Sequence, residues 1–243
     1  MTKFKFILSL FTGTIIAANI GLHAAAKPDC RRVEQDWRKL QAANLRFVED
    51  PVYIKQRLET AGGQNPTYAV LSCADSRTPP ELIFNKGLGK IFCPRVAGNT
   101  AGAQVIDSIA FAVATWDVTT IVVLGHTSCG AVEAALGRLQ KSGGVIDKRN
   151  GILGAVLIPI ERAIVKSGMD IYGPNAFEEA TKANVAFAAE RLIEKSDVIC
   201  KALESGQIII VGAIYDLATG VASEQFIIEN CRDCREQRRP CCK

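Results

Sequence analysis

Two short motifs in the sequence contain side chains that could hold a metal ion. A CADSR motif at residues 73–77 supplies one thiol, and a GHTSCG motif at residues 125–130 supplies an imidazole and a second thiol. Two thiolates and one imidazole suit zinc, and three protein ligands with an open fourth position are typical of catalytic rather than structural zinc. We therefore predict that Cys73, His126 and Cys129 bind one Zn²⁺ ion. Unrelated thiols or a disulfide are the alternatives.

Each motif directly follows an apolar run that has the pattern of a β-strand. The runs Tyr68–Ser72 and Thr120–Gly125 are rich in Val, Leu and Ile without polar alternation, which is typical of strands buried on both faces. Ligand-binding and catalytic groups collect at the carboxyl ends of parallel strands in open α/β sheets. The two motifs are therefore expected at the same edge of one sheet.

Strand-like and helical patterns alternate along the rest of the chain. Further strands are predicted at Ile91–Arg95 and Ile208–Tyr215. This alternation predicts an α/β fold with a mostly parallel sheet covered by helices on both faces. Helices are predicted near Ala101–Trp116, Ala131–Gln140, Leu153–Lys166 and Phe177–Ile193, and a surface loop at Lys141–Asn150.

The first 26 residues have the three-part pattern of a secretory signal peptide. Lys3 and Lys5 precede an uncharged stretch, which ends in three alanines at residues 24–26. We expect cleavage near Ala26 and an exported protein, periplasmic or secreted, without stable membrane insertion. The alternative is an uncleaved anchor, because Phe6–Ala26 is just long enough to span a bilayer.

Three further segments follow the leader. Apolar residues at helix-like spacing predict an N-terminal helical arm over residues 27–62, with a second helix opening at Pro51. Residues 63–230 form the predicted zinc-binding α/β catalytic domain, and residues 231–243 form a Cys-rich tail.

Composition excludes several classes of protein. The chain has 243 residues, 48% of them hydrophobic, and a net charge of +4 that falls to +2 without the leader. These values exclude a disordered chain, and no basic surface field argues for nucleic acid binding. The length fits one ordinary domain with short extensions.

The spacing of the two motifs, Cys-x-Asp-Ser-Arg and then His-x-x-Cys-Gly about fifty residues later, resembles the β-class carbonic anhydrases. The resemblance runs from roughly Gln64 to Tyr215. It implies a zinc enzyme that reversibly hydrates carbon dioxide to bicarbonate and a proton, and a homodimer or higher homo-oligomer. It also implies that Cys73, His126 and Cys129 bind zinc and that Asp75 and Arg77 are the catalytic pair.

Other positions match the plant-like branch of that family. Gln64, nine residues before Cys73, resembles the substrate-binding Gln of this branch, and Phe92 matches an apolar residue of its pocket. Phe111 stands where the branch has a pocket Tyr. Plain core packing remains the alternative for the two Phe residues, and a turn before Asn65 is the alternative for Gln64.

Some members of the family have a closed form in which an oxygen of the motif Asp, here Asp75, binds zinc. The branch that holds an inhibitory bicarbonate uses Trp, Arg and Tyr for it. Arg95 and Tyr215 match that set, but Val70 occupies the Trp position. We therefore expect the open form, in which Asp75 pairs with Arg77.

Seven cysteines remain outside the two motifs, so at least one stays unpaired within a monomer. Disulfides are the default for an exported protein, and a second zinc site or redox chemistry stays open. A glycine-rich segment, residues 98–102, could bind an anion with backbone amides or be a simple turn. The seven cysteines are Cys30, Cys93, Cys200, Cys231, Cys234, Cys241 and Cys242.

Two other functions compete with carbon dioxide hydration. A relative could hydrolyse carbon disulfide or carbonyl sulfide on the same site, or the chain could be a non-catalytic zinc- or thiol-binding module. A zinc deaminase is disfavoured because its His-x-Glu and Pro-Cys-x-x-Cys motifs are absent.

Overall fold

The structure, a computed structural model, describes residues 30–147 and 153–229. The described chain divides into two compact units, the helix α1 (Cys30–Glu49) and everything from Pro51 onward. The sequence placed the end of the helical arm at residue 62, whereas this division places α2 (Pro51–Thr60) with the larger unit. None of the described helices is both long enough and apolar enough to cross a membrane.

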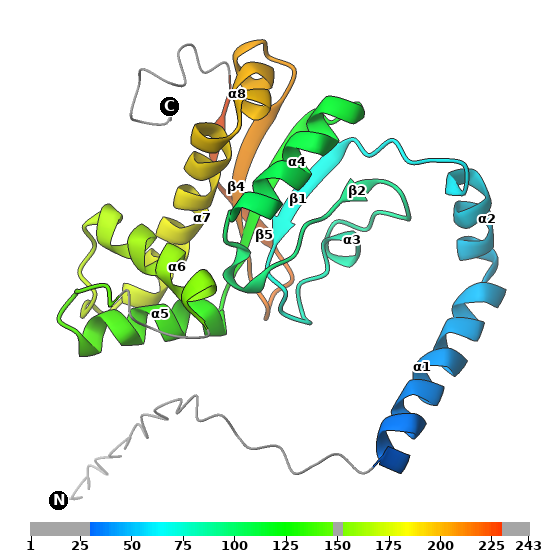
Figure 1. The fold of residues 1–243 in the computed structure, drawn as a ribbon, viewed down its shortest axis with the longest axis horizontal. Helices are drawn as coiled ribbons and strands as arrows, with labels where there is room; N and C mark the ends of the chain where they lie inside the picture. The colour runs from blue at the N-terminus through cyan, green and yellow to red at the C-terminus, as the bar shows by residue number, and fades with distance from the viewer. Residues whose placement is uncertain (1–29, 148–152, 230–243) are drawn as a thin grey trace, which may run out of the picture. The chain divides into compact units, whose positions relative to one another are not determined.

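A five-stranded sheet forms the centre of the larger unit (Figure 1). Its order is β2-β1-β3-β4-β5, with the first four strands parallel and β5 antiparallel to β4. The predicted α/β fold with a mostly parallel sheet is confirmed. The strands are β1 (Tyr68–Ser72), β2 (Ile91–Phe92), β3 (Thr120–His126), β4 (Ile209–Tyr215) and β5 (Ala222–Ile228).

Helices connect the strands, and a 3₁₀ turn at Ala97–Asn99 follows β2. Two boundaries have clear local causes: Ser196 caps α8 by accepting a hydrogen bond from the Ile199 amide, and Gly168 ends α6 with a φ of 69°. The helices are α3 (Pro80–Ile83), α4 (Ala103–Thr115), α5 (Gly130–Lys141), α6 (Gly154–Ser167), α7 (Ala176–Lys195) and α8 (Asp197–Glu204).

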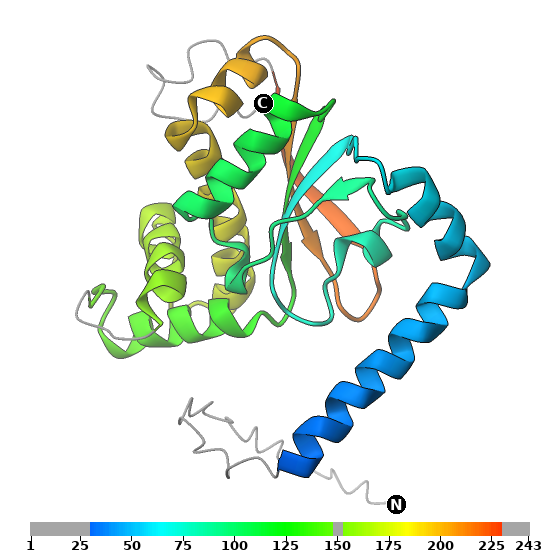
Figure 2. The same cartoon turned by 45° about the vertical axis from the view of Figure 1, so that its right-hand side comes forward.

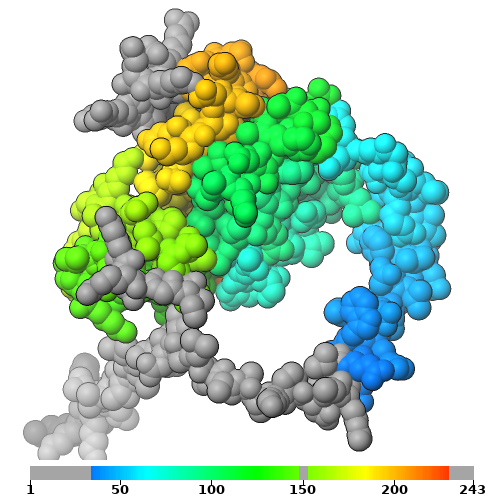
Figure 3. Space-filling model, viewed as in Figure 1, coloured from blue at the N-terminus to red at the C-terminus, as the bar shows by residue number. Residues whose placement is uncertain are grey.

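Helices lie on both faces of the sheet, but they cover the two faces unequally. Helices α4, α7 and α8 pack on one face, over alternate strand residues such as Leu71, Ile121 and Ile210 (Figure 2). Their side chains close over most of this face in the space-filling view (Figure 3). The opposite face has a smaller cluster around Val70 and Leu124, against which residues of α3 pack.

The turns that leave β1 and β3 lie at the carboxyl edge of the sheet, beside α5 and α6. The two strands run in register with Ser72 opposite Leu124, so both chains leave the sheet at the same edge. Gly125 lets α7 approach β3 closely, because a Cβ there would lie 2.6 Å from a methyl group of Val185. Side chains of α5 and α6 form a separate apolar cluster, which packs around Cys73 and Cys129.

Candidate metal centre

Three buried side chains meet at the carboxyl edge of the sheet. Cys73 follows β1, His126 is the last residue of β3, and Cys129 directly precedes α5. They are 4%, 1% and 1% exposed, and one potential ligand atom of each lies within 4.8 Å of the other two. The structure therefore brings together the three residues that the sequence predicts as ligands.

The imidazole of His126 has one nitrogen available for a metal. Its Nδ1 lies 2.8 Å from the carbonyl oxygen of Thr127. A carbonyl only accepts hydrogen bonds, so Nδ1 carries the proton and Nε2 has a free lone pair. This Nε2 is buried and has no hydrogen-bond partner among the described residues. A buried polar atom without a partner is unusual in a folded protein. An imidazole that donates from one nitrogen and has a free lone pair on the other is in the form that binds a metal.

The two thiols are close enough to share one proton. The hydrogen bond between them lowers the pKa of Cys73 and raises the pKa of Cys129. The backbone amides of Gly98 and Asp75 also donate to the Cys73 sulfur, at 3.2 and 3.4 Å. Burial acts to lower the pKa of His126, but the nearby Cys73 sulfur and its charge raise it overall. The thiolate that these contacts favour is the form that binds metals.

The donor set fits a zinc ion. Two sulfur atoms and one imidazole nitrogen are the ligands that zinc accepts in tetrahedral sites, and all three are held by secondary structure or by turns that directly follow strands. A set of three leaves one tetrahedral position for water or substrate, as catalytic zinc requires.

Asp75 and Arg77 form a two-point ion pair beside the three ligands. Arg77 Nε donates to Asp75 Oδ1 at 2.9 Å and Nη2 donates to Oδ2 at 2.7 Å. The hydrogen bonds from Arg77 hold the pKa of Asp75 well below its usual range, and Asp75 raises the pKa of Arg77. Arg77 Nη2 also donates to the carbonyl oxygen of Ser128 at 3.3 Å. Arg77 therefore joins the loop after β1 to the loop after β3.

Two more side chains fix the backbone of the first loop. Arg95 donates from Nε to the Cys73 carbonyl at 3.0 Å and from Nη2 to the Asp75 carbonyl at 2.5 Å. The buried hydroxyl of Thr78 lies 3.2 and 3.1 Å from the same two carbonyl oxygens. Sequence reasoning noticed Arg95 only for its match to a bicarbonate-holding residue. It missed Thr78, whose position directly after the CADSR motif was the only signal for it.

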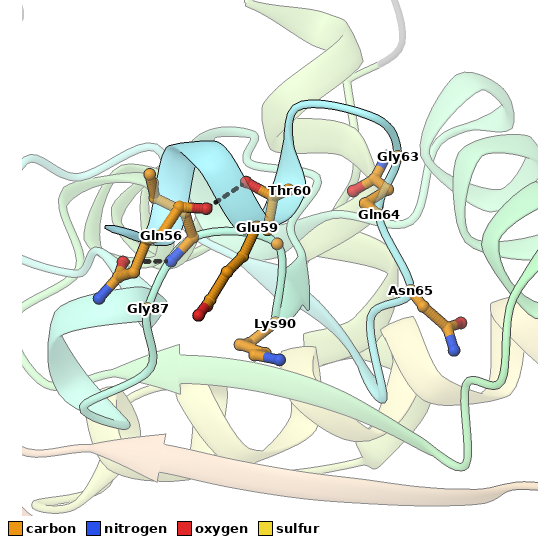
Figure 4. Close-up of a pocket in the computed structure, with 10 residues that line it drawn as sticks. Gln56, Glu59, Thr60, Gly63, Gln64, Asn65, Gly87 and Lys90 are labelled. Carbon is orange, nitrogen blue, oxygen red and sulfur yellow. Dashed lines mark hydrogen bonds between the residues drawn. The ribbon is translucent and has the colours of Figure 1, made fainter. Parts of the chain in front are cut away.

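Gln64 lies at the other end of β1. It precedes the amino end of that strand, whereas Cys73 follows the carboxyl end, and β1 itself is about 13 Å long at about 3.3 Å per residue. Gln64 is exposed and lines a cavity of about 480 Å³ between α2 and the segment before β2 (Figure 4). Glu59 and Lys90 bring one charge of each sign to this cavity. The described chain therefore does not place Gln64 beside the metal ligands.

The two predicted pocket Phe residues both contact the ring of Trp116. The ring centroids of Phe92 and Phe111 are each 5.4 Å from that of Trp116. Phe92 packs against the large core cluster, and Phe111 on α4 is 56% exposed. This placement does not test their predicted role in substrate binding.

Val70 and Tyr215 belong to the smaller apolar cluster of the sheet. Val70 is 1% exposed, and Tyr215 is partly buried against the same cluster. The backbone carbonyl of Tyr215 accepts a hydrogen bond from the Thr127 amide at 3.0 Å, which ties β4 to the second metal loop.

The cysteines outside the two motifs have different surroundings. Burial raises the pKa of Cys93 to about 12, and Cys200 is buried on α8 with its sulfur 3.5 Å from Glu204 Oε1. The leader, the Cys-rich tail with its four cysteines and the side chain of Cys30 lie outside the described residues. The predicted disulfides therefore stay a prediction.

Comparison with known proteins agrees with this geometry. A family model described as carbonic anhydrase matches residues 68–222. A protein named carbonic anhydrase 2 from Mycobacterium tuberculosis is 35% identical over 191 residues, covering 76% of this chain and 89% of the relative. The β-carbonic anhydrase CafA of Aspergillus fumigatus is similar in structure, with a TM-score of 0.63 and 25% identity, covering 79% of this chain and 90% of that chain.

A second solved structure resembles the chain in fold alone. It is one of two tetrameric β-carbonic anhydrases from Sordaria macrospora, with a TM-score of 0.62 and 21% identity, covering 80% of this chain and 97% of that chain. The matched residues, 68–222, include all three predicted metal ligands together with Asp75 and Arg77. By its sequence, its fold and its Cys-His-Cys cluster, this chain belongs to the β-class carbonic anhydrase family.

Proposed function

We propose that this carbonic anhydrase reversibly hydrates carbon dioxide with one zinc ion per subunit, held by Cys73, His126 and Cys129. The observation that supports this most directly is the buried Nε2 of His126, which has no hydrogen-bond partner among the described residues. One ring nitrogen of the same histidine lies within 4.8 Å of both potential sulfur ligands. A zinc ion held there would lower the pKa of water and so supply a hydroxide nucleophile for carbon dioxide near neutral pH.

Asp75 acts as the hydrogen-bond acceptor that orients the attacking water. A carboxylate has about four lone-pair positions. Asp75 Oδ1 accepts from the Arg77 backbone amide and from Nε, whereas Oδ2 accepts from Nη2, so acceptor capacity remains on Oδ2. Arg77 keeps Asp75 ionised, because its hydrogen bonds lower the pKa of that carboxyl. An ionised carboxylate accepts hydrogen bonds but cannot donate them. The water must therefore donate its hydrogen bond to Asp75.

The reaction also has to release a proton, and the site has no spare imidazole for this. The sequence holds two histidines, and His126 is the one outside the predicted leader. Its Nδ1 proton is held by the Thr127 carbonyl, and its Nε2 is assigned to zinc. Protons therefore leave through ordered water to a buffer molecule.

Stopped-flow hydration assays combined with metal analysis test this proposal. The purified protein should contain one zinc per chain, lose carbon dioxide hydration when a chelator removes the metal and regain it when zinc is added. The same preparation should be given carbon disulfide and carbonyl sulfide. Hydrolysis of those compounds without hydration of carbon dioxide would overturn the proposed substrate.

We further propose that the resting enzyme has the open form and belongs to the plant-like branch. Three observations support this: Asp75 is held at two points by Arg77, Val70 stands at the Trp position of the inhibitory site, and Arg95 donates to two backbone carbonyls. Bicarbonate should then inhibit only as a product, without cooperativity. A crystal structure near neutral pH with an Asp75 oxygen bonded to zinc would contradict the open form.

A homodimer or larger homo-oligomer is the proposed assembly. The Sordaria macrospora β-carbonic anhydrase that shares this fold is tetrameric, which supports the proposal, and so do large apolar side chains exposed on both N-terminal helices. Trp37 and Leu40 on α1 are 60% and 64% exposed, and Leu58 on α2 is 76% exposed. Sedimentation equilibrium should give at least twice the mass of one chain. A monomer at micromolar concentration would overturn this assembly.

Export with removal of the leader is proposed from the charged start and small-residue end of residues 1–26. Mass spectrometry of protein from the exported fraction should show a chain that begins near Lys27. Recovery of the full-length chain from membranes alone would support the anchor instead.

A further inference from the structure

We propose that Asn184 on α7 is a positioning residue of the metal site, because it fixes the turn that directs the Gly98 amide at the Cys73 sulfur. This inference rests on the proposed role of Cys73 as a zinc ligand. The side-chain amide of Asn184 bonds to Gly98 rather than to a metal ligand, so it would act on the site through Gly98.

Asn184 is one of two polar residues, with Thr181, among the buried and mostly apolar residues of α7. It is 2% exposed, and its neighbours along the buried face of α7 include Ala180, Val185 and Ala188. A buried amide without hydrogen bonds is costly, so its partners show what it does. Its Nδ2 donates to the carbonyl oxygen of Gly98 at 2.8 Å, across 86 residues of sequence. The side chain therefore connects α7 to the turn after β2.

The turn that Asn184 holds has an unusual backbone. Gly98 has a φ of 67°, and a Cβ at that position would lie 2.6 Å from Cδ1 of Ile160. Asn99 follows with a φ of 44°, although it is not glycine. A positive φ costs glycine little, but at Asn99 it is unfavourable unless surrounding contacts fix the turn. The hydrogen bond from Asn184 and the contact with Ile160 are such contacts.

Gly98 is held from one side by Asn184 and donates on the other side to sulfur. Its carbonyl accepts from Asn184, and its N–H donates to Cys73 Sγ at 3.2 Å. The second amide on this sulfur, from Asp75 at 3.4 Å, belongs to the CADSR motif itself and so moves together with Cys73. Gly98 is therefore the donor whose position depends on another part of the fold.

An amide hydrogen bond draws charge from a thiolate and so sets how strongly that sulfur donates to a metal. Partners of metal ligands typically change metal affinity or activity by about 10- to 100-fold when they are removed. Loss of the Asn184 hydrogen bond should let the 97–99 turn relax and weaken the Gly98 contact. Cys73 would then become a stronger electron donor and a less well-oriented ligand.

The test uses the full-length protein with cobalt(II) in place of zinc, because cysteine bound to cobalt gives a sulfur-to-metal charge-transfer band. Asn184→Leu removes the donor at similar volume. We expect its charge-transfer band to move to longer wavelength, and its zinc to pass to a chromogenic chelator about 10-fold faster or more. Asn184→Ser, whose hydroxyl is too short to reach Gly98, should show the same direction of change and covers the case in which the Leu variant does not fold.

Thr181→Val is the matched control. Thr181 lies on the same helix and is 3% exposed, but its hydroxyl bonds to the Phe177 carbonyl within α7. This variant should leave the band and the zinc transfer rate as in the unmodified protein. A folded Asn184 variant with an unshifted band, or an equal shift in Thr181→Val, would overturn the positioning role. Absence of the band in the unmodified protein would instead contradict the proposed zinc ligands.

Discussion

The two ends of strand β1 differ in how the chain holds its polar side chains. Beyond the carboxyl end, Cys73 is 4% exposed, and its loop is fixed by hydrogen bonds from Arg95, Thr78 and Gly98. Before the amino end, Gln64 is exposed and has no hydrogen-bond partner among the described residues. The fold of this chain positions the side chain of Cys73, and it does not position the side chain of Gln64.

This difference shows which assignments follow from the chain alone. Metal ligands need fixed geometry before the metal binds, and the carboxyl end has it. The amino end instead lines an open cavity, in which Gln56 rather than Gln64 is held by a hydrogen bond, from the Leu88 amide at 2.9 Å. Within the described chain, Gln64 therefore has no contact that would orient it for substrate binding.

The largest effect is expected from removal of a metal ligand at the carboxyl end. Cys129→Ser should lose zinc and reduce hydration by more than about 1,000-fold, because the metal supplies the nucleophile. Metal analysis and stopped-flow assays measure both quantities. Cys200→Ala, which changes a buried cysteine on α8, is the control and should keep both. Full zinc occupancy in Cys129→Ser would show that the ligand assignment is wrong.

Removal of the carboxylate beside the ligands should have the next largest effect. Asp75→Asn keeps the shape of the side chain but loses the charge that Arg77 holds, and we expect hydration to fall about 10- to 100-fold with zinc retained. Asp107→Asn, an exposed acid on α4, is the control. Unchanged kcat in Asp75→Asn would remove Asp75 from the catalytic pair.

Proton release gives a second test of the metal site. His126 is the only imidazole among the described residues and is assigned to zinc, so no second imidazole there can carry the proton away. Imidazole has the pKa best suited to carry protons near neutral pH. Turnover at saturating carbon dioxide should therefore rise several-fold with the concentration of an imidazole-type buffer, at fixed pH and ionic strength. A flat response would mean that proton transfer to buffer does not limit the rate.

We expect a smaller change in activity from substitutions at the amino end of β1. Gln64→Ala should raise KM for carbon dioxide a few-fold and leave zinc content and stability unchanged, if Gln64 contacts substrate. Gln56→Ala is the contrasting variant: it should lower the free energy of unfolding by about 1 kcal/mol, because the Leu88 amide loses its acceptor. An unchanged kcat/KM in Gln64→Ala would confine the active site to the carboxyl end.

Local sequence patterns predicted most of the fold and the metal ligands. Continuous apolar runs identified β1, β3 and β4, and the parallel pairing of β1 with β3 then placed Cys73 near His126. Strand β5 was not predicted, because its edge position leaves Ser223 and Glu224 exposed and gives it no apolar alternation.

Contacts between distant segments could not be predicted from sequence. Arg95 bonds the loop after β1 from 22 residues away, and Asn184 bonds Gly98 from 86 residues away. Neither side chain has a local pattern that reveals its partner, because the fold alone determines which backbone carbonyl it reaches. For Gln64, the predicted strand Tyr68–Ser72 already lay between it and Cys73, but the sequence could not show which side chains Gln64 contacts.

The smallest expected effect concerns acid pH and the Asp75–Arg77 pair. Hydrogen bonds from Arg77 hold the pKa of Asp75 below its usual value of about 3.9. A carboxyl with a lowered pKa in the folded state stabilises the protein above the pKa of the unfolded chain, and this contribution is lost as pH falls towards the folded value. Arg77→Gln removes the cause, so the unmodified protein should exceed the variant in stability near pH 6, and by less as the pH falls below about 4.

Urea unfolding of both proteins at matched pH values measures that difference, and the contribution of zinc cancels where both bind the metal with equal affinity. Lys182→Gln is the control, because Lys182 pairs with Glu178 at 2.6 Å on the surface of α7 and such exposed pairs contribute little. Its difference from the unmodified protein should stay small at every pH. A difference for Arg77→Gln that does not shrink in acid would mean that Arg77 stabilises the loop through the Ser128 carbonyl rather than through the ionised carboxylate.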